Sequence, residues 1–177
     1  KPNDKLPEEY NLKTTAMPTN GVLAGSFNKD LSVQAGSIIG EDGIWSGQSG
    51  LYGIGANIHR TPYSGRNAEY YSECGTLTGI IAGYECKAIE SKGVHVYNKH
   101  FALNDQENTR HGIATWATEQ TMREIYLRAF EMPIEIGNAF NIMSGFNRVG
   151  IEACAGSYAL NTSFLRKECG LQGAIVT

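Results

Sequence analysis

The chain has 177 residues, of which 41% are hydrophobic and 19% charged, with a formal net charge of −3 at pH 7. These values are typical of one globular domain with a sizeable core, and they exclude a disordered chain. The slightly negative net charge gives no indication of a basic surface that would bind nucleic acid or an anionic membrane. No apolar run approaches the length that spans a bilayer, and residues 1–11 do not resemble a signal peptide.

The cysteines and histidines predict neither a disulfide framework nor a metal site. No CxxC pair occurs, and the cysteines are irregularly spaced, which favours free thiols. The histidines share no metal-ligand spacing such as HxxxH, and strand alternation puts His95 and His100 on opposite faces. We therefore expect no metal and no cofactor. The residues concerned are Cys74, Cys86, Cys154 and Cys169, and His59, His95, His100 and His111.

The first third of the chain predicts an irregular lead-in, one helix and one strand. Residues 1–27 carry three prolines and no clear periodicity, which favours extended or irregular backbone. Asn28 is a plausible N-cap for a helix that Gly43 and residues 47–50 break. Residues 51–58 then read as a short buried strand that runs into a polar loop over 59–73. The apolar face of the helix comprises Leu31, Ala35, Ile38 and Ile39.

The middle of the chain predicts a second helix followed by a strand with a polar end. The helix carries one apolar face and ends at Gly93. Residues 94–97 have the β-branched and aromatic composition of a half-buried strand. The chain turns polar at Asn98 and opens into a charged loop that extends to residue 110. The helix face comprises Leu77, Ile80, Ile81, Tyr84 and Ala88.

The last part of the chain predicts two more helices and two more strands. Pro133 is expected to kink or end the third helix, because a mid-helix proline removes a hydrogen bond and clashes with the preceding turn. A strand at 139–146, a loop at 147–150, a helix at 158–168 that stops at Gly170, and a strand at 174–177 follow. The third helix is the best-patterned segment, with Met122, Ile125, Tyr126, Ala129 and Phe130.

This order of elements predicts an α/β fold with a parallel sheet. Strands that alternate with single helices pair in parallel through right-handed crossovers, so the loops after residues 58, 98 and 146 are expected to meet on one rim. About four strands are present, whereas a closed (β/α)₈ barrel typically has about 250 residues. We therefore interpret residues 1–177 as a single partial domain with part of a TIM-type barrel.

Four ordered blocks carry a resemblance to one enzyme family. They are NIHRTPYSGRNAEYYSE at 57–73, KHFALNDQENTR at 99–110, MSGFNRVG at 143–150 and LRKECGLQGAIVT at 165–177. Together they resemble the bacterial β-glucosidases of glycoside hydrolase family 3. The resemblance implies the central portion of the N-terminal (β/α)₈ barrel of that family, roughly its second to fifth βα units.

The resemblance also implies which residues bind substrate. Arg66 and the pair Lys99–His100 match groups that contact hydroxyls of the sugar in the glycone subsite. Phe146 takes the aromatic position of the SxYN block, where its ring packs without a tyrosine hydroxyl. Sugars need directed donors and an aromatic wall, and donors that bind more tightly in the transition state assist the reaction. The residues expected to orient these groups or a loop backbone, rather than to act as a catalytic pair, are Glu69, Glu73, Glu107 and Arg110.

The catalytic carboxylates implied by the family do not match residues of this chain. Family members are retaining enzymes that use two carboxylates roughly 5–5.5 Å apart. The nucleophilic aspartate is expected immediately after Thr177, and the general acid/base far downstream. Cys74 stands where an aspartate is usual, and Cys169 where an aromatic residue is common. We therefore expect the 177-residue chain alone to be inactive.

The sequence thus predicts carbohydrate hydrolysis: part of a retaining exo-β-glycosidase of the β-glucosidase type, a hydrolase that needs no cofactor. Its expected partners are a β-linked glucoside or oligosaccharide, the remainder of its own barrel and a second domain. Two alternatives stay open: a β-xylosidase or arabinofuranosidase of the same family, and a non-catalytic sugar-binding half-barrel that self-assembles through its open sheet edges. The sequence does not indicate a compartment.

Overall fold

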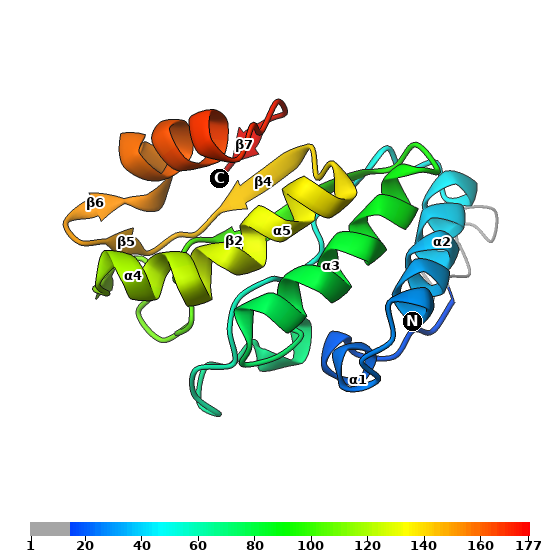
Figure 1. Cartoon of the computed structure of the whole chain (residues 1–177), viewed down its shortest axis with the longest axis horizontal. Helices are drawn as coiled ribbons and strands as arrows, with labels where there is room; N and C mark the ends of the chain where they lie inside the picture. Colours follow the sequence, from blue (N-terminus) through cyan, green and yellow to red (C-terminus); the bar gives the residue numbers. More distant parts are fainter. Residues whose placement is uncertain (1–14) are drawn as a thin grey trace, which may run out of the picture.

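The computed structural model describes residues 15–177, which form an open four-stranded sheet with helices packed along it (Figure 1). The strand order is β1-β2-β4-β7, and every neighbouring pair is parallel. One helical segment connects each strand to the next, as the sequence predicts. No helix within residues 15–177 has the length and apolar character to cross a membrane.

The bounds of the elements are as follows. The strands of the main sheet are β1 (Gly50–Leu51), β2 (His95–Phe101), β4 (Asn141–Ser144) and β7 (Ile175–Val176). The helices are α1 (Asn20–Gly25), α2 (Lys29–Trp45), α3 (Gly75–Glu90), α4 (Glu119–Thr121), α5 (Arg128–Gly137) and the π-helical segments η3 (Met122–Leu127) and η5 (Ala159–Glu168). Short 3₁₀ turns form η2 (Asn67–Glu69) and η4 (Cys154–Gly156), and a small second sheet contains β3 (Ala114–Thr115), β5 (Arg148–Val149) and β6 (Glu152–Ala153).

The predicted irregular lead-in is wrong for its last part. Its first 14 residues lie outside the described part of the chain, but Asn20–Gly25 forms α1. A helix this short has little stability of its own, so tertiary packing has to supply it. Leu23 and Ala24 are both buried in the core, and their burial holds the single turn and a half in place.

Helix α2 begins as predicted and ends at Trp45, before the predicted break at residues 47–50. The Asn28 side chain accepts hydrogen bonds from the backbone N–H groups of Asp30 and Leu31, which confirms it as the N-cap. The predicted break at Gly43 is wrong, because α2 continues to Trp45. A Cβ at position 43 would lie 2.8 Å from a methyl group of Val94. The glycine therefore lets the helix pass close to the start of β2.

The predicted buried face of α2 is only partly correct. Leu31 and Ile38 are 42% and 40% exposed, whereas Ala35 is buried as predicted. The contact with α3 is made instead by small residues: a Cβ at Gly36 would lie 2.3 Å from the Glu85 carbonyl oxygen. Close approach of two helix backbones excludes large side chains from the seam and moves them outward.

Helix α3 forms where the sequence predicts it, and Gly93, which follows its end, has a φ of +91°. Of its predicted apolar face, Ile81 and Ala88 are buried, whereas Leu77, Ile80 and Tyr84 are only partly buried. Gly170 has a φ of +75° and likewise follows η5 at the predicted position. The left-handed conformation favours glycine because it has no Cβ. Both predicted helix stops are confirmed.

The first predicted strand, 51–58, is much shorter in the structure. Only Gly50–Leu51 pairs as β1, and a single further bridge joins Gly55 to Lys99. Ile54 has a φ of 50°, a left-handed conformation that interrupts the extended backbone between these two contacts. The rest of the segment is buried but irregular.

The second strand is longer than predicted. The sequence turns polar at Asn98, yet β2 runs from His95 to Phe101. The backbone ladder overrides the polarity: Asn98 pairs with Ile142 of β4, and Lys99 donates its N–H to the Ile54 carbonyl oxygen at 2.9 Å. Lys99 and His100 are therefore held on a strand rather than on a free loop.

The predicted kink or end at Pro133 is also wrong. The helical segment continues from Glu119 to Gly137 through α4, η3 and α5, with Pro133 inside α5. Met132 and Ile134, on either side of the proline, are buried against the neighbouring helix. A Cβ at Gly79 of α3 would lie 2.8 Å from Met132, so the two helices are in close contact. This packing offsets the missing hydrogen bond.

The later strands are shorter than predicted, and one small sheet is not predicted at all. Of the predicted strand at 139–146, only Asn141–Ser144 forms β4, and of the predicted strand at 174–177, only Ile175–Val176 forms β7. Strand β5 lies in the predicted loop 147–150 and pairs in parallel with β3 and antiparallel with β6. Two-residue strands carry too little alternation to be recognised in a sequence.

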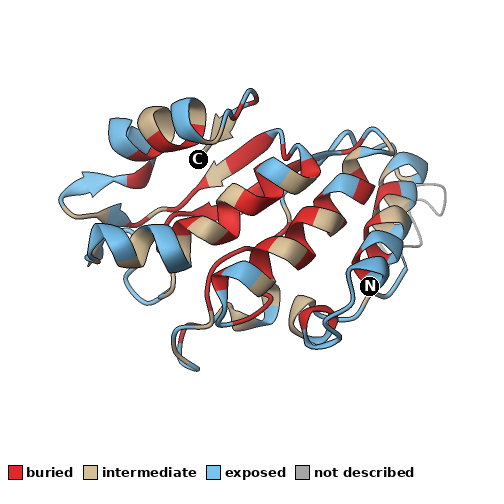
Figure 2. Cartoon of the chain, viewed as in Figure 1, coloured by how far each residue is buried: buried red, intermediate tan, exposed pale blue. Residues whose placement is uncertain are grey.

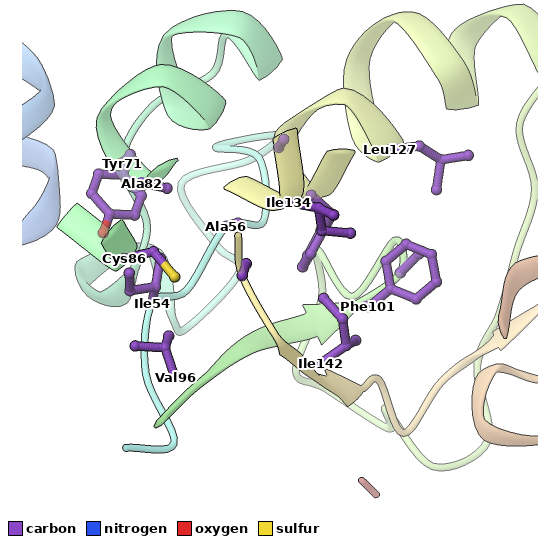
Figure 3. Close-up of a cluster of buried hydrophobic side chains, with 14 of the residues drawn as sticks. Ile54, Ala56, Tyr71, Ala82, Cys86, Val96, Phe101, Leu127, Ile134 and Ile142 are labelled. Carbon is purple, nitrogen blue, oxygen red and sulfur yellow. The ribbon is translucent and has the colours of Figure 1, made fainter. Parts of the chain in front are cut away.

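The core lies between the sheet and the helices, as the buried surfaces of β4, α3 and α5 show (Figure 2). Figure 3 shows Phe101 and Ile142 from adjacent strands close together, with Leu127 on the helical side. The Phe101 ring meets Phe130 edge-on at 5.1 Å and stacks on Phe164 at 6.1 Å. Phe101 thus joins the helices on both sides of the β2 end.

One polar pair lies inside this core. The Tyr71 hydroxyl donates a hydrogen bond to Glu85 Oε2 at 2.6 Å, and both side chains are buried. Burial raises the pKa of the Glu85 carboxyl to about 7, although the bond from Tyr71 opposes this rise. The folded state therefore holds a proton at pH 6 that the unfolded chain has released.

We predict that Glu85→Gln removes a pH-dependent loss of stability. Between about pH 4.5 and 7 the folded state binds more protons at Glu85 than the unfolded state, so wild-type stability falls as the pH rises through this window. The free energy of unfolding of the variant minus that of the wild type should be up to about 3 kcal/mol higher at pH 8 than at pH 4.5. Urea unfolding at both pH values measures this. Exposed Glu152→Gln is the control, and an equal response from both variants would contradict the assignment.

Candidate functional site

Three loops meet at the carboxyl ends of β1, β2 and β4, and we call this region the mouth. It comprises residues 57–73, 98–111 and 145–147. The loops are tied together by hydrogen bonds: the Glu107 N–H donates to the Ser64 carbonyl oxygen at 3.2 Å, and Asn147 Nδ2 donates to the Ala102 carbonyl oxygen at 3.0 Å. The predicted meeting of these loops on one rim is therefore confirmed.

Glu69 joins two cations, one from its own loop and one from the end of β2. Arg66 Nε donates to Glu69 Oε1 at 2.9 Å, and its terminal nitrogen donates to Oε2 at 3.0 Å, which makes a two-bonded pair. Lys99 Nζ lies 2.9 Å from Glu69 Oε2. The Arg66 and Lys99 side chains are 21% and 16% exposed, so both remain partly open at the mouth.

Glu107 extends this set of ion pairs across the mouth. Its Oε1 lies 3.8 Å from Arg66 and accepts a bond from Asn104 Nδ2 at 3.1 Å. Its Oε2 accepts a bond from Arg110 at 2.7 Å. Charges therefore alternate along a continuous series from the strand end to the far loop: Lys99, Glu69, Arg66, Glu107 and Arg110.

Phe146 connects the third loop to the end of this series. The Arg110 guanidinium carbon lies 4.8 Å from the centre of the Phe146 ring, and the His111 ring stacks on Phe146 at 5.0 Å. Cations and flat rings favour such positions over an aromatic face. The aromatic wall of the mouth is thus held by two polar side chains of the neighbouring loop.

His100 is held by its backbone and by its ring. The His100 N–H donates to Asn57 Oδ1 at 2.7 Å, and Asn57 Nδ2 donates to the His100 carbonyl oxygen at 2.9 Å. The peptide bond between Lys99 and His100 is cis. On the ring, Nδ1 lies 3.3 Å from the Tyr70 hydroxyl. Tyr70 is fully buried and His100 nearly so.

The charges around His100 keep its ring neutral. Burial, followed by the positive charges of Arg66 and Lys99, lowers the pKa of His100 to about 3. Partial burial raises the pKa of Glu69, but hydrogen bonds from Lys99 and Arg66 outweigh it, and the pKa lies below its ordinary value. At neutral pH Arg66 and Lys99 therefore lie beside a neutral imidazole, with Glu69 ionised between these two cations.

The structure brings together the side chains expected to bind substrate, Arg66, Lys99, His100 and Phe146, and places Glu69, Glu107 and Arg110 in contact with them. Glu73 is exposed before α3, and no hydrogen bond or ion pair connects its side chain to another described residue. Cys74 is the N-cap of α3, its sulfur accepting from the Leu77 N–H at 3.5 Å. The cysteines are all free thiols, as predicted.

The sequence assigned no role in holding His100 or Phe146 to three residues of the mouth: Asn57, Tyr70 and His111. Asn57 is an amide at the end of a stretch of otherwise small and apolar residues. This is the one local signal that its side chain could bind to a buried backbone segment. Tyr70 has the ordinary pattern of a core tyrosine. Its partner His100 lies 30 residues away, so the pairing carries no local signal.

The remaining acidic groups of the mouth do not form a metal site. Asp105 Oδ1 accepts the Ile58 N–H at 3.2 Å, and burial raises the pKa of this carboxyl to about 7. Within the part of the chain that the structure describes, no group of three or more histidine, cysteine or acidic side chains is arranged to hold a metal ion. The mouth is instead rich in directed donors beside an aromatic ring, which suits a ligand with several hydroxyl groups.

Residues 9–177 match the glycosyl hydrolase family 3 N terminal domain. The chain is 39% identical over 169 residues to a beta-glucosidase from Ruminococcus albus, covering 96% of this chain and 18% of that protein. It is 35% identical over 166 residues to the thermostable beta-glucosidase B of Acetivibrio thermocellus, covering 94% of this chain and 22% of that protein. The chain therefore spans about a fifth of the length of these relatives.

The fold is similar to solved structures of such enzymes. Beta-glucosidase 3B from Thermotoga neapolitana, solved in complex with α-D-glucose, superposes with a TM-score of 0.94 at 36% identity, covering 98% of this chain and 24% of that one. A beta-glucosidase from Paenibacillus barengoltzii gives a TM-score of 0.90 at 39% identity over 93% of this chain and 18% of that one. The parallel sheet and its helices are accordingly part of a TIM-type barrel.

We predict that Asn57→Ala destabilises the protein by about 2–4 kcal/mol. The change leaves the buried N–H and carbonyl oxygen of His100 without partners, and each unpaired group costs about 1–3 kcal/mol. Urea unfolding measures the free energy of unfolding. The exposed amide variant Asn108→Ala should change it by less than about 0.5 kcal/mol. A similar small change for both variants would show that Asn57 does not hold His100.

Proposed function

This chain belongs to glycosyl hydrolase family 3, and we propose that it supplies the sugar-binding part of a retaining exo-β-glycosidase of the β-glucosidase type. One observation carries the proposal: Arg66 from the first loop and Lys99 from the end of β2 reach the same Glu69 carboxylate, beside the buried ring of His100. In the proposal, these three donors of different shape face one small volume. A pyranose ring, with hydroxyl groups on neighbouring carbons, fits such a set.

The named side chains have separate roles in the proposal. Arg66 and Lys99 donate to hydroxyl groups of the terminal sugar, and His100 donates from its neutral ring. Phe146 provides the apolar wall. Positive charge develops on the sugar ring in the transition state, so a further net positive charge at the site would oppose the reaction. Glu69 therefore both holds the cations and limits the positive potential at the site.

The catalytic carboxylates belong to the proposed remainder of the protein. A retaining mechanism needs two carboxyl groups roughly 5–5.5 Å apart. In the described mouth, Glu69 and Glu107 are both engaged by cations, and Asp105 is bonded to backbone. We propose that residues 1–177 are the central portion of one barrel, whose other strands pair with the edges at β1 and β7, and that a second domain completes the site.

The names of the relatives, and the sugar bound in one of them, support glucose as the sugar. The Thermotoga neapolitana enzyme was solved in complex with α-D-glucose, and the Ruminococcus albus and Acetivibrio thermocellus relatives are named beta-glucosidases. We therefore propose a β-linked glucoside or a short oligosaccharide with glucose at its non-reducing end as the substrate.

We predict that Arg66→Ala, in the natural protein that contains this chain, lowers kcat/KM for a chromogenic β-glucoside by about 10- to 100-fold. The variant loses charge-assisted hydrogen bonds worth about 1.5–3 kcal/mol. The control is Arg148→Ala, which removes an exposed arginine of β5 and should leave kcat/KM within about twofold. Equal activity of the two variants would contradict the role of Arg66.

We also predict that a polypeptide of these 177 residues alone does not turn over the same substrate. Glu69, Glu107 and Asp105 are engaged by cations or backbone, and the two carboxylates of a retaining mechanism are proposed to lie in the remainder of the protein. The assay is release of the chromophore at enzyme concentrations 1,000 times higher than for the natural protein (about 10³-fold, the scale of a lost catalytic group). Far-UV circular dichroism verifies that the polypeptide is folded. Rates close to those of the natural protein would refute this prediction.

A further inference from the structure

Tyr70 and His100 form a buried pair whose proton position is determined by their surroundings. The Tyr70 hydroxyl oxygen lies 3.3 Å from His100 Nδ1, and the two rings meet edge-on at 6.3 Å. Tyr70 has no exposed surface and His100 is 2% exposed. The geometry allows two arrangements: Tyr70 donates to Nδ1, or a protonated Nδ1 donates to the Tyr70 oxygen.

The two arrangements differ in whether the buried Tyr70 hydroxyl has a hydrogen-bond acceptor. Among the described residues, His100 Nδ1 is the one hydrogen-bond partner of the Tyr70 hydroxyl. If Nδ1 carried the proton, the Tyr70 O–H would point at no acceptor, and an unpaired buried hydroxyl costs about 1–3 kcal/mol. If Tyr70 donates, the hydroxyl is satisfied and Nδ1 is the acceptor.

The charges near the pair favour the same arrangement. Burial raises the pKa of the Tyr70 hydroxyl far above its ordinary value, so the phenol keeps its proton. Arg66 and Lys99, held beside the ring by Glu69, oppose an additional positive charge on His100. A neutral imidazole that accepts at Nδ1 carries its proton on Nε2.

We infer that Tyr70 is a positioning residue that holds His100 as the Nε2–H tautomer, so that the ring presents a fixed donor to a hydroxyl group of the sugar. The inference rests on the proposed function for the identity of the acceptor, but not for the position of the proton. Asn57 holds the His100 backbone from both sides, and Tyr70 holds the ring. Together they fix the position and the direction of a single N–H group.

A fixed tautomer determines what the ring can recognise. With the proton on Nε2, His100 binds an oxygen lone pair, and it cannot accept a hydrogen bond at that atom. A hydroxyl group can rotate to offer a lone pair, whereas an ammonium group on the same sugar carbon cannot. We therefore expect the mouth to discriminate against an amino sugar at the position facing His100, in addition to the repulsion from Lys99.

The decisive measurement is a neutron structure of the natural protein crystallised near pH 7 in D₂O. We expect deuterium on His100 Nε2, none on Nδ1, and the Tyr70 deuterium pointing at Nδ1. Deuterium on Nδ1 would overturn the inference. Because the crystal needs no substrate, this result stands apart from the proposed function, whose own failure would be absence of β-glucoside hydrolysis by the wild-type protein.

Kinetics of a matched pair of variants test the positioning role. Tyr70→Phe removes the hydroxyl next to His100, and Tyr71→Phe removes the neighbouring buried hydroxyl that bonds to Glu85. We expect Tyr70→Phe to lower kcat/KM about 3- to 10-fold, mainly through KM, and to shift the acidic limb of its pH profile upward. Tyr71→Phe should change neither. Identical kcat/KM values and pH profiles for the two variants would overturn the positioning role.

Discussion

The mouth of this protein depends on the Glu69 carboxylate, which holds Arg66 of its own loop and Lys99 of β2 within 2.9 Å of its oxygens. Without it, two positive charges would face each other beside a buried ring, and unit charges 4 Å apart repel by about 4 kcal/mol at an effective dielectric constant of 20. With it, the two donors are close together and still partly exposed. The same carboxylate makes the first loop and the second strand a single unit.

The parallel sheet makes that contact possible. Lys99 lies at the end of β2 and is fixed in register by hydrogen bonds to the backbone of Ile54 and Ala56, so the loop that carries Arg66 starts from a defined place. Glu107 and Arg110 then connect to Phe146 beyond β4. Catalytic and binding groups at the carboxyl ends of parallel strands are a general property of barrels. Here ion pairs join the first two ends, and the contact of Arg110 with the Phe146 ring joins the third.

The residues proposed to face the ligand could be recognised from the sequence, whereas those that hold them could not. Arg66, Lys99 and His100 stand in recognisable blocks with polar neighbours. Asn57 and Tyr70 act on His100 from 43 and 30 residues away, and a buried amide or tyrosine has the same local pattern whether it packs or positions. Hydrogen bonds to a distant backbone leave no periodicity in the sequence.

The sequence alone determined the order of helices and strands, the parallel sheet and the family, because hydrophobic periodicity, helix stops such as Gly93 and the four ordered blocks are local properties. Tertiary packing decided where the elements end. Helix α5 continues through Pro133 and α2 through Gly43 because each lies against a neighbouring element, and β2 continues past Asn98 because β4 pairs with it. It also decided the proton on His100, since the group that bonds to Nδ1 comes from another loop. Long-range contacts supply free energies of several kcal/mol, which exceed the local preferences that a sequence displays.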